Sequence, residues 1–510
     1  MVIPRPGAET PQEGFFTLGP RTVLRGPGEL TTAIRDALGP ATGFALPSGT
    51  AAEDGLIEAD VDHTLVPEAY RLTVEPSRVR LIGGGAAGVF YALQTLRQLL
   101  PPAILRSATA PGERWEIPAV VIEDAPRFSW RGGHLDVGRH FVPKADLLRL
   151  IDLLALHKFN VLHLHLTEDQ GWRFESRLYP LLTEVGSWRR ETSGDGTPHG
   201  GFYSQADLRE VVAFAARRHI TVVPEIDLPG HVQAAVAAYP ELGNDPSRRI
   251  EVATGWGVIT HVLNLEEKTL KFCADIIGEV TEIFPGRFLH VGGDECPTDE
   301  WSGSGRARER MRELGIGDVE EIQGWFTRRL SAILAEHGRS LVGWDEICDH
   351  GDVPGATIHA WRGYERGVEA ARAGHDVIMS PVAPTYFDYY QSDRDDEPRT
   401  IGGHNTVENV YDWDPIQAEL SEEEGRRVIG TQFQVWTEWQ PTPRDVEYMS
   451  YPRACALAEV GWTSGPKDRE DFMRRLAEHL GRLDALGVNY RPLEGPRPWQ
   501  RGGTGARARV

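Results

Sequence analysis

The chain has 510 residues, of which 40% are hydrophobic and 25% are charged, the balance of a soluble globular protein too long for a single core. Its net charge of -21 argues against a nucleic acid or an anionic membrane surface as its partner. No run of residues approaches the roughly 18 apolar positions that a membrane span needs.

The four cysteines, Cys273, Cys296, Cys348 and Cys455, are scattered and form no C-x-x-C pair. Their spacing argues against a disulfide framework and against a thiolate zinc site. The start of the chain has neither the basic nor the apolar region of a signal peptide. We therefore expect a cytoplasmic protein, or a secreted one if a leader has been removed.

Two segments precede the main body of the chain. Residues 1–15 are rich in proline and glycine, and we expect a loose N-terminal arm there. Residues 16–124 are typical of a small α+β supporting domain. Apolar and polar residues alternate over 70–81, which predicts a β-hairpin, and apolar residues at helical spacing predict a helix over 86–100.

From residue 125 to residue 490 the pattern changes to alternating strands and helices. The predicted strands are Trp130–Val137, Val161–Leu166, Thr221–Asp227, Phe288–Asp294, Ser340–Glu346, Thr357–Trp361, Asp376–Ser380 and Gly430–Trp436. The predicted helices are Leu147–Leu156, Gln205–Arg217, Glu266–Ile283, Val319–Glu336, Glu365–Ala373, Val446–Glu459 and Glu470–Leu486. Eight such units predict an α/β fold, a (β/α)8 TIM barrel preceded by the smaller α+β domain. Residues 491–510 are expected to form a C-terminal tail.

Polar and aromatic residues gather at the predicted strand ends, where TIM barrels carry their active sites. In chain order they are Arg131, Asp169, Asp227, His231, Asp294, Glu295, Trp344, Trp361, Tyr386, Asp388, Trp436 and Glu438. Carboxylates and arginine hold hydroxyl groups by charge-assisted hydrogen bonds, and tryptophan faces stack on the apolar faces of pyranose rings. The set therefore predicts a sugar-binding site.

The fourth strand runs into two glycines and then two adjacent acids. Successive side chains on a strand face opposite sides, so Asp294 and Glu295 can serve one site only if the strand ends or bends there. Gly292 and Gly293 permit such a bend. A solvated acidic turn would account for the pair alone, but the other strand-end residues favour a functional pair.

Here the sequence resembles a known family. The stretch His290-Val291-Gly292-Gly293-Asp294-Glu295 resembles the H-x-G-G-D-E signature of glycoside hydrolase family 20, the β-N-acetylhexosaminidases. Residues 130–132, 164–173, 225–231, 343–346 and 436–438 also resemble family motifs, in the family's order. Six motifs in register cover the whole barrel, and the first domain resembles the α+β domain that precedes the barrel in the family. Glu168 departs from the pattern, because the family often has Asp there.

The resemblance implies a retaining exo-enzyme that removes terminal β-linked GlcNAc or GalNAc without a cofactor or metal. Its nucleophile would be the substrate's own 2-acetamido oxygen, which closes an oxazolinium ring. The implied partner is a carbohydrate with a terminal N-acetylhexosamine, with no nucleic acid and no membrane.

The resemblance also implies a role for each site residue. Glu295 would be the general acid and then base, and Asp294 would hold the acetamido N–H. Tyr386 would bind the acetamido oxygen, and Asp169 with His231 would tune Glu295. Trp344, Trp361 and Trp436 would enclose the acetyl methyl and the ring, while Arg131, Asp388 and Glu438 would bind hydroxyls. The charge of Asp294 and partial burial should raise the pKa of Glu295, which a general acid needs near neutral pH.

Two other functions remain as alternatives. His163 and His165 form an H-x-H on a barrel strand, as in metal-dependent amidohydrolases, and His134 and His290 could add ligands. Hydrogen-bonded interior residues beneath the site are the better explanation of these histidines, because amidohydrolases carry H-x-H on the first strand and no lysine lies near a middle strand end to bridge two metals. The second alternative is a sugar-binding barrel without catalysis, which the intact Asp294-Glu295 pair argues against.

Overall fold

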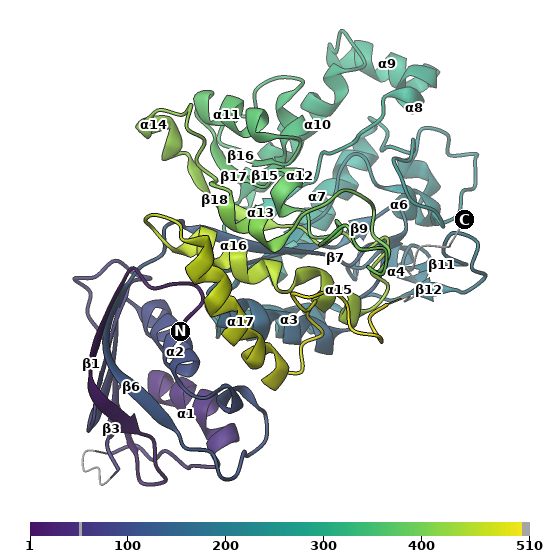
Figure 1. Cartoon of the computed structure of the whole chain (residues 1–510). Coiled ribbons are helices and arrows are strands. Elements are labelled where there is room, and N and C mark those ends of the chain that lie inside the picture. Colours follow the sequence, from purple (N-terminus) through teal and green to yellow (C-terminus); the bar gives the residue numbers. More distant parts are fainter. Residues whose placement is uncertain (50–53, 502–510) are drawn as a thin grey trace.

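The computed structural model describes residues 1–49 and 54–501. It consists of a β-sheet domain with two helices, formed by the first part of the chain, and a larger α/β barrel (Figure 1). Within these residues no helix is both long enough and apolar enough to cross a membrane.

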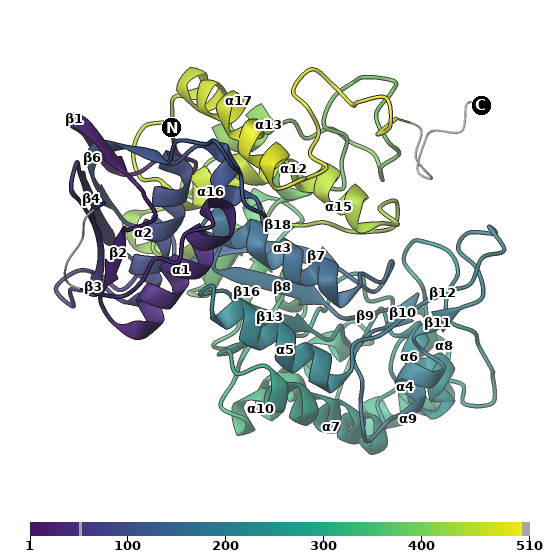
Figure 2. The same cartoon turned by 90° about the horizontal axis from the view of Figure 1, so that it is seen from below.

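Among the described residues of the first domain, six strands form one sheet in the order β1-β6-β4-β5-β3-β2. Their bounds are β1 Ala8–Thr17, β2 Val23–Arg25, β3 Leu56–Val61, β4 Tyr70–Glu75, β5 Arg78–Gly83 and β6 Glu116–Asp124. Helices α1 (Gly28–Thr42) and α2 (Ala86–Leu99) cover the face of the sheet that is turned toward the barrel (Figure 2). The predicted hairpin is confirmed, because β4 and β5 pair antiparallel.

The expectation of a loose arm over residues 1–15 is wrong. Most of that segment lies in β1, which pairs antiparallel with β6 and forms the edge of the sheet. The many polar residues of β1 are explained by its position, because the strand is exposed along most of its length. Ile3, before the strand, is fully buried and exchanges two hydrogen bonds with Gln98 on α2.

The predicted TIM barrel is confirmed. Over the described part of the chain, eight parallel strands close in the order β13-β14-β15-β16-β17-β18-β7-β8. Their bounds are β7 Trp130–Asp136, β8 Val161–His165, β13 Thr221–Glu225, β14 Phe288–His290, β15 Ser340–Trp344, β16 Thr357–Ala360, β17 Asp376–Met379 and β18 Val428–Phe433. Each predicted strand is present, and each ends between one and four residues earlier than expected, which leaves the polar residues on the loops that follow.

Helices surround this barrel. They are α3 Lys144–Leu156, α5 Gln205–Ala216, α7 Glu267–Ile283, α10 Glu321–Glu336, α11 Tyr364–Arg372, α15 Pro443–Ser450, α16 Arg453–Trp462 and α17 Arg469–Ala485. Ser204 caps α5 in a capping box with Asp207. The single helix predicted over Val446–Glu459 is wrong, because Pro452 separates α15 from α16 and proline cannot donate the backbone hydrogen bond of a helix interior.

Shorter elements lie in the connections. They are η1 Pro102–Leu105, β9 Thr167–Glu168, β10 Gly171–Trp172, α4 Leu181–Glu184, β11 Trp188–Arg189, β12 His199–Gly200, α6 Gln233–Ala238, η2 Pro240–Leu242, α8 Asp299–Gly303, α9 Gly305–Leu314, η3 Asp345–Cys348, α12 Val382–Thr385, α13 Val407–Asp412 and α14 Glu422–Gly425. Of the expected tail, residues 491–501 pack on the barrel through the ion pair of Arg491 with Glu397 at 2.7 Å, and residues 502–510 lie outside the described residues.

A buried polar network joins the two domains. Asp124, at the end of β6, accepts hydrogen bonds from Lys158 Nζ at 3.0 Å and from Trp462 Nε1 at 2.9 Å. Tyr70 donates to the same carboxylate at 2.6 Å. Lys158 follows α3 and Trp462 ends α16, so one acid of the first domain holds two elements of the barrel.

Arg131 belongs to this interface, and its predicted place at the sugar-binding mouth is wrong. It is the second residue of β7 and therefore lies at the N-terminal end of the barrel. Its guanidinium binds Glu68 at 2.7 Å and the hydroxyl of Tyr91 at 3.1 Å, both in the first domain. The side chain is 1% exposed, so it has no access to a ligand at the opposite end.

Candidate active site

The two acids sit on a loop that begins where β14 ends at His290. Gly292 and Gly293 have φ of 69° and 91°, in the region that favours glycine, and turn the chain sharply. A Cβ at Gly292 would collide with the carboxylate of Asp227, which accepts a hydrogen bond from Gly293 N at 3.0 Å. The bend expected from the sequence is present, and it brings Asp294 and Glu295 to one side.

One histidine lies against both acids. The Nε2 atom of His231 is 3.7 Å from Asp294 Oδ2 and 3.7 Å from Glu295 Oε2. Its Nδ1 atom lies 2.7 Å from Glu168 Oε1 and 3.3 Å from Asp169 Oδ2. Burial alone would lower the pKa of His231, but Glu168 and Asp169 raise it well above its usual value. The site therefore holds an imidazolium cation between two pairs of carboxyl groups.

Asp294 and Glu295 differ in their surroundings. The side chain of Asp294 is 13% exposed, and its Oδ1 atom is buried with no hydrogen-bond partner among the described residues. The side chain of Glu295 is 40% exposed and faces the mouth. Its partial burial and the adjacent charge of Asp294 raise the pKa of Glu295, which favours a protonated carboxyl. Asp294 thus offers an acceptor, and Glu295 offers a proton.

An aromatic cluster forms the wall beside these acids. Trp344, Tyr386 and Trp436 pack together, with centroid distances of 5.8 Å between Trp344 and Trp436 and 6.4 Å between Tyr386 and Trp436. The ring of Trp361 stacks on Tyr386 at 6.0 Å. These residues come from the ends of β15, β16, β17 and β18, so the sequence correctly placed them on one surface. Trp344 is anchored from below, because its indole N–H donates to Glu225 Oε1 at 2.9 Å.

Glu346 is a further acid at this wall; the sequence placed it at a strand end within a family motif but suggested no role for it. Its carboxylate accepts the indole N–H of Trp361 at 2.9 Å and so fixes the orientation of that ring. Burial, followed by the charges of Asp345 and Asp294, raises the pKa of Glu346 to about 8.

The arginine of the mouth is Arg139, not Arg131. Arg139 lies three residues beyond the end of β7, and its Nη2 atom is 3.0 Å from Glu168 Oε2. Its guanidinium carbon lies 5.0 Å from the centroid of Trp436. Burial would lower the pKa of Arg139, but the charges of Glu168 and Glu438 raise it, so the guanidinium stays protonated. Its Nε and Nη1 atoms are buried with no hydrogen-bond partner among the described residues.

Asp388 and Glu438 lie near this cation. Burial and then the charge of Glu438 raise the pKa of Asp388 well above its usual value, and burial also raises the pKa of Glu438. The Oδ1 atom of Asp388 is buried and unpartnered within the described residues. Arg139 could have been found from the sequence by its position, since it follows a strand at its C-terminal end, whereas Arg131 precedes most of the same strand.

The histidines of the metal alternative lie beneath the site, around Glu225. His163 Nε2 and His290 Nδ1 are 3.0 and 3.1 Å from this carboxylate. The donor atoms of His163, His290 and His359 lie within 4.8 Å of one another. This grouping alone would suit a metal ion.

The state of His165 argues against the ligand pair that the alternative requires. His165 Nδ1 lies 2.6 Å from Glu225 and its Nε2 lies 3.1 Å from Glu168. Burial would lower the pKa of His165, but the two carboxylates raise it well above its usual value. Both ring nitrogens of His165 thus face carboxylate oxygens at hydrogen-bond distance, so neither is directed at an open position for a metal. The H-x-H pair is better explained as support for the floor of the pocket.

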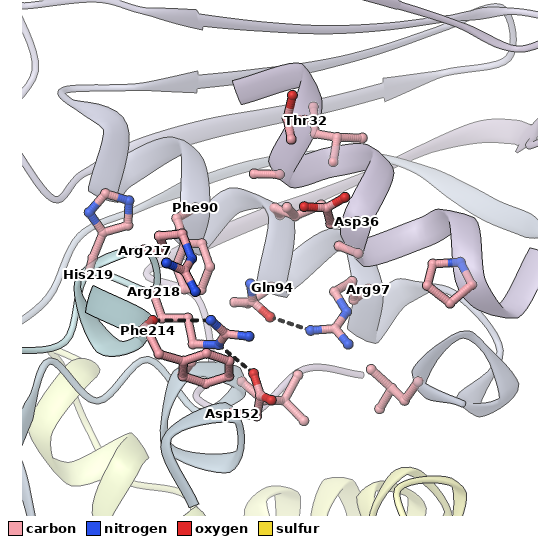
Figure 3. Close-up of a pocket in the computed structure, with 18 of the residues that line it drawn as sticks. Thr32, Asp36, Phe90, Gln94, Arg97, Asp152, Phe214, Arg217, Arg218 and His219 are labelled. Atoms are coloured by element: carbon pink, nitrogen blue, oxygen red, sulfur yellow. Dashed lines mark hydrogen bonds and ion pairs between the residues drawn. The ribbon is translucent and has the colours of Figure 1, made fainter. Parts of the chain in front are cut away.

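A separate cavity of about 1150 Å³ lies between the first domain and the barrel helices, lined by α1, α2, α3 and the end of α5. Figure 3 shows Arg97, Arg217 and Arg218 around it, with Arg97 bound to Gln94 at 2.8 Å and Arg218 to Asp152 at 2.5 Å. It borders the residues that precede β13 and so lies at the N-terminal end of the barrel. The paired acids are at the opposite end, which separates this cavity from the candidate active site.

Comparison with known proteins gives a consistent result. A family model described as "Glycosyl hydrolase family 20, catalytic domain" matches residues 128–465, and one described as "Glycosyl hydrolase family 20, domain 2" matches residues 1–125. A β-hexosaminidase of Porphyromonas gingivalis is 41% identical over 517 aligned residues, which cover 99% of this chain. This chain spans 65% of the length of that relative.

Solved structures are similar over nearly the whole chain. The β-N-acetylhexosaminidase of Streptomyces coelicolor has a TM-score of 0.86 at 33% identity, over 97% of this chain and 98% of that one. A mutant β-hexosaminidase of Streptomyces plicatus, solved with its product GlcNAc, has a TM-score of 0.85 at 34% identity, over 97% of each chain.

Proposed function

Because this chain belongs to glycosyl hydrolase family 20, we propose that it is an exo-β-N-acetylhexosaminidase that removes terminal β-linked GlcNAc or GalNAc from glycans. The observation that carries the proposal is the Oδ1 atom of Asp294, which has no hydrogen-bond partner among the described residues and lies beside Glu295 near a cluster of four aromatic rings. The relatives named above are β-hexosaminidases, and one of them holds GlcNAc as its product.

Catalysis begins with Glu295. Its carboxyl group, kept protonated by a raised pKa, gives its proton to the glycosidic oxygen as the bond from that oxygen to C1 breaks. The resulting carboxylate then takes a proton from the water that attacks C1 in the second step. His231 lies 3.7 Å from Glu295 and, as a cation, stabilises this carboxylate.

The nucleophile is the acetamido oxygen of the substrate, which bonds to C1 and forms an oxazolinium ring; family 20 enzymes are recorded exceptions to the two-carboxylate scheme. The free Oδ1 of Asp294 accepts the acetamido N–H and opposes the positive charge that develops on the ring. Tyr386 supplies a hydroxyl to the acetamido oxygen, and Trp344, Trp361 and Trp436 enclose the acetyl methyl.

The outer hydroxyls of the sugar are bound at the other side of the pocket. We assign the binding of sugar hydroxyls, first expected of Arg131, to Arg139. Its Nε and Nη1 groups make no hydrogen bond within the described residues and can donate to a ligand. Asp388, with an unpartnered oxygen, and Glu438 complete this set. Arginine with flanking carboxyl groups offers both donors and acceptors, which hydroxyl recognition requires. We expect these groups to hold the hydroxyls of the terminal sugar, which would direct the enzyme to chain ends.

Mass spectrometry of the enzyme quenched during turnover of a 2-acetamido glycoside tests this mechanism. We expect no sugar adduct on any peptide, because the covalent bond forms within the substrate. We also expect Asp294→Asn to lower kcat by roughly 10² or more, since the charge that opposes the oxazolinium is lost. Asp299→Asn, at an exposed acid five residues away, is the matched control and should retain full activity. A sugar adduct on the peptide that contains Asp294 would overturn the mechanism.

A further inference from the structure

A small cavity of about 270 Å³ lies beside the candidate active site but is not part of it. Its wall includes Trp439 and Gln440, which follow Glu438 directly in the chain, together with residues of α15 and of the C-terminal segment near Trp499. The backbone N–H of Gln440 donates to Thr437 O at 3.1 Å. The segment 436–440 therefore contributes to the catalytic pocket through its first residues and to this cavity through its last.

The amide of Gln440 is the unusual feature of the cavity. The residue is 2% exposed, and both Oε1 and Nε2 are buried without a hydrogen-bond partner among the residues described. Leaving a buried polar group unpaired costs about 1–3 kcal/mol. The other amides of the cavity are satisfied, because Gln500 Nε2 donates to Asn489 Oδ1 at 3.0 Å. One amide is thus available to donate and to accept.

Two tryptophans and an arginine accompany this amide. The side chain of Trp499 is 70% exposed at the rim, a high value for so large an apolar ring. The guanidinium carbon of Arg399 lies 3.4 Å from the ring centroid of Trp439. In residues 1–49 and 54–501, no carboxylate forms an ion pair with Arg399. The guanidinium of Arg399 covers one face of Trp439, so the exposed indole of Trp499 is the ring surface offered to a ligand. An indole face, a guanidinium donor and a free amide are groups that recognise a sugar ring, which has apolar faces and hydroxyls at its edges.

From these contacts we propose that the cavity is a second saccharide-binding site, distinct from the catalytic pocket. Its volume is just below the range of about 300–1,000 Å³ typical of small-molecule sites, so it accommodates a single ring. One hydroxyl donates to Gln440 Oε1 and another accepts from Nε2, while an indole face covers the ring. The site would hold a branch of a glycan, or a second chain, next to the entrance at which chain ends are cleaved.

Ligand-observed NMR tests this site with the catalytic pocket blocked. The enzyme is saturated with a thiazoline mimic of the oxazolinium, and chitotriose is then added and titrated. We expect saturation transfer to persist in the wild type, and Trp499→Ala and Gln440→Met to weaken this second binding by roughly tenfold or more. Trp188→Ala removes another exposed tryptophan, on β11, and should leave it unchanged. Trp499→Ala is the safer variant because its side chain is already in solvent.

Two results would overturn the second site. The first is the absence of saturation transfer in the blocked wild type, which would mean that the cavity holds only water. The second is equal binding of chitotriose by the wild type, Trp499→Ala and Gln440→Met. Failure of the second site can be told apart from failure of the proposed activity. Failure of that activity would appear as absent turnover of an aryl GlcNAc glycoside and absent thiazoline binding, while failure of the second site would leave both intact.

Discussion

Two neighbouring acids in this protein have different surroundings, which fit the two different roles that we propose for them. Asp294 is largely enclosed and has one oxygen without a partner in the part of the chain that the structure describes, while Glu295 is 40% exposed and has a raised pKa. The sequence predicted the pair and most of the aromatic wall, since each residue follows a recognisable strand. It misplaced the arginine, because Arg131 lies at the start of β7 and Arg139 lies beyond its C-terminal end, where the site is.

Replacing Glu295 tests the role of general acid that we propose for it. We expect Glu295→Gln to lower kcat/KM for chitobiose by roughly 10² to 10⁴, because the amide cannot protonate a poor leaving group. An aryl glycoside needs less protonation and should lose less. The control Glu309→Gln, at an exposed acid on α9, should match the wild type.

The pH dependence of the same variant gives a second check. A raised pKa keeps Glu295 protonated to higher pH, so kcat/KM of the wild type should fall as pH rises through that pKa. Glu295→Gln does not titrate and should lack this limb on aryl substrates. Equal turnover of chitobiose by both proteins would contradict the assignment of Glu295.

At the scale of elements, the site depends on strands that stop early. β14 contributes only Phe288–His290 before the glycine turn, and the polar residues of the mouth occupy loops. Alternation and apolar runs in the sequence predicted where strands lie. They did not predict that β1 orders the first segment, because its pairing partner β6 is about a hundred residues away. The same patterns predicted one helix in place of α15 and α16. The apolar periodicity continues across Pro452, but the helical backbone is interrupted there.

The glycine turn after β14 can be tested by substitution. Gly292→Ala would place a Cβ against Asp227 at a φ of 69°, so we expect a loss of unfolding free energy of about 1–3 kcal/mol and a large loss of activity. Chemical denaturation and kcat measure both effects. Gly303→Ala, on α8, meets no atom within 4 Å and should change neither. Full activity in Gly292→Ala would show that the bend does not position the acids.

At the scale of the whole molecule, the first domain is fixed to the barrel by buried charges. The side chains of Lys158 and Asp124 are 0% and 1% exposed. Burial lowers the pKa of Lys158, and the negative charge of Asp124 opposes that shift. No local pattern in the sequence indicates this ion pair, because Asp124 belongs to the first domain and Lys158 to the barrel. The two side chains meet only when both domains have folded and packed together.

Removing one partner of this pair should be costly. We expect Asp124→Ala to reduce the free energy of unfolding by about 3–5 kcal/mol, because Lys158 would remain charged and buried without its partner. Glu123→Ala, at the adjacent acid, breaks an exposed ion pair with Arg71 and should cost at most about 1 kcal/mol. Urea denaturation compares the two, and equal losses would show that the interface does not depend on Asp124.

The most direct test of the proposed function compares two aryl glycosides that differ only at C2. If the acetamido oxygen is the nucleophile, the wild-type enzyme should hydrolyse the 4-nitrophenyl β-glycoside of GlcNAc and turn over the corresponding β-glucoside negligibly, because the glucoside carries a hydroxyl in place of the amide. The measurement is kcat/KM for both substrates at the same pH. Comparable values for the two would contradict the proposal and would assign the nucleophile to a carboxylate of the protein.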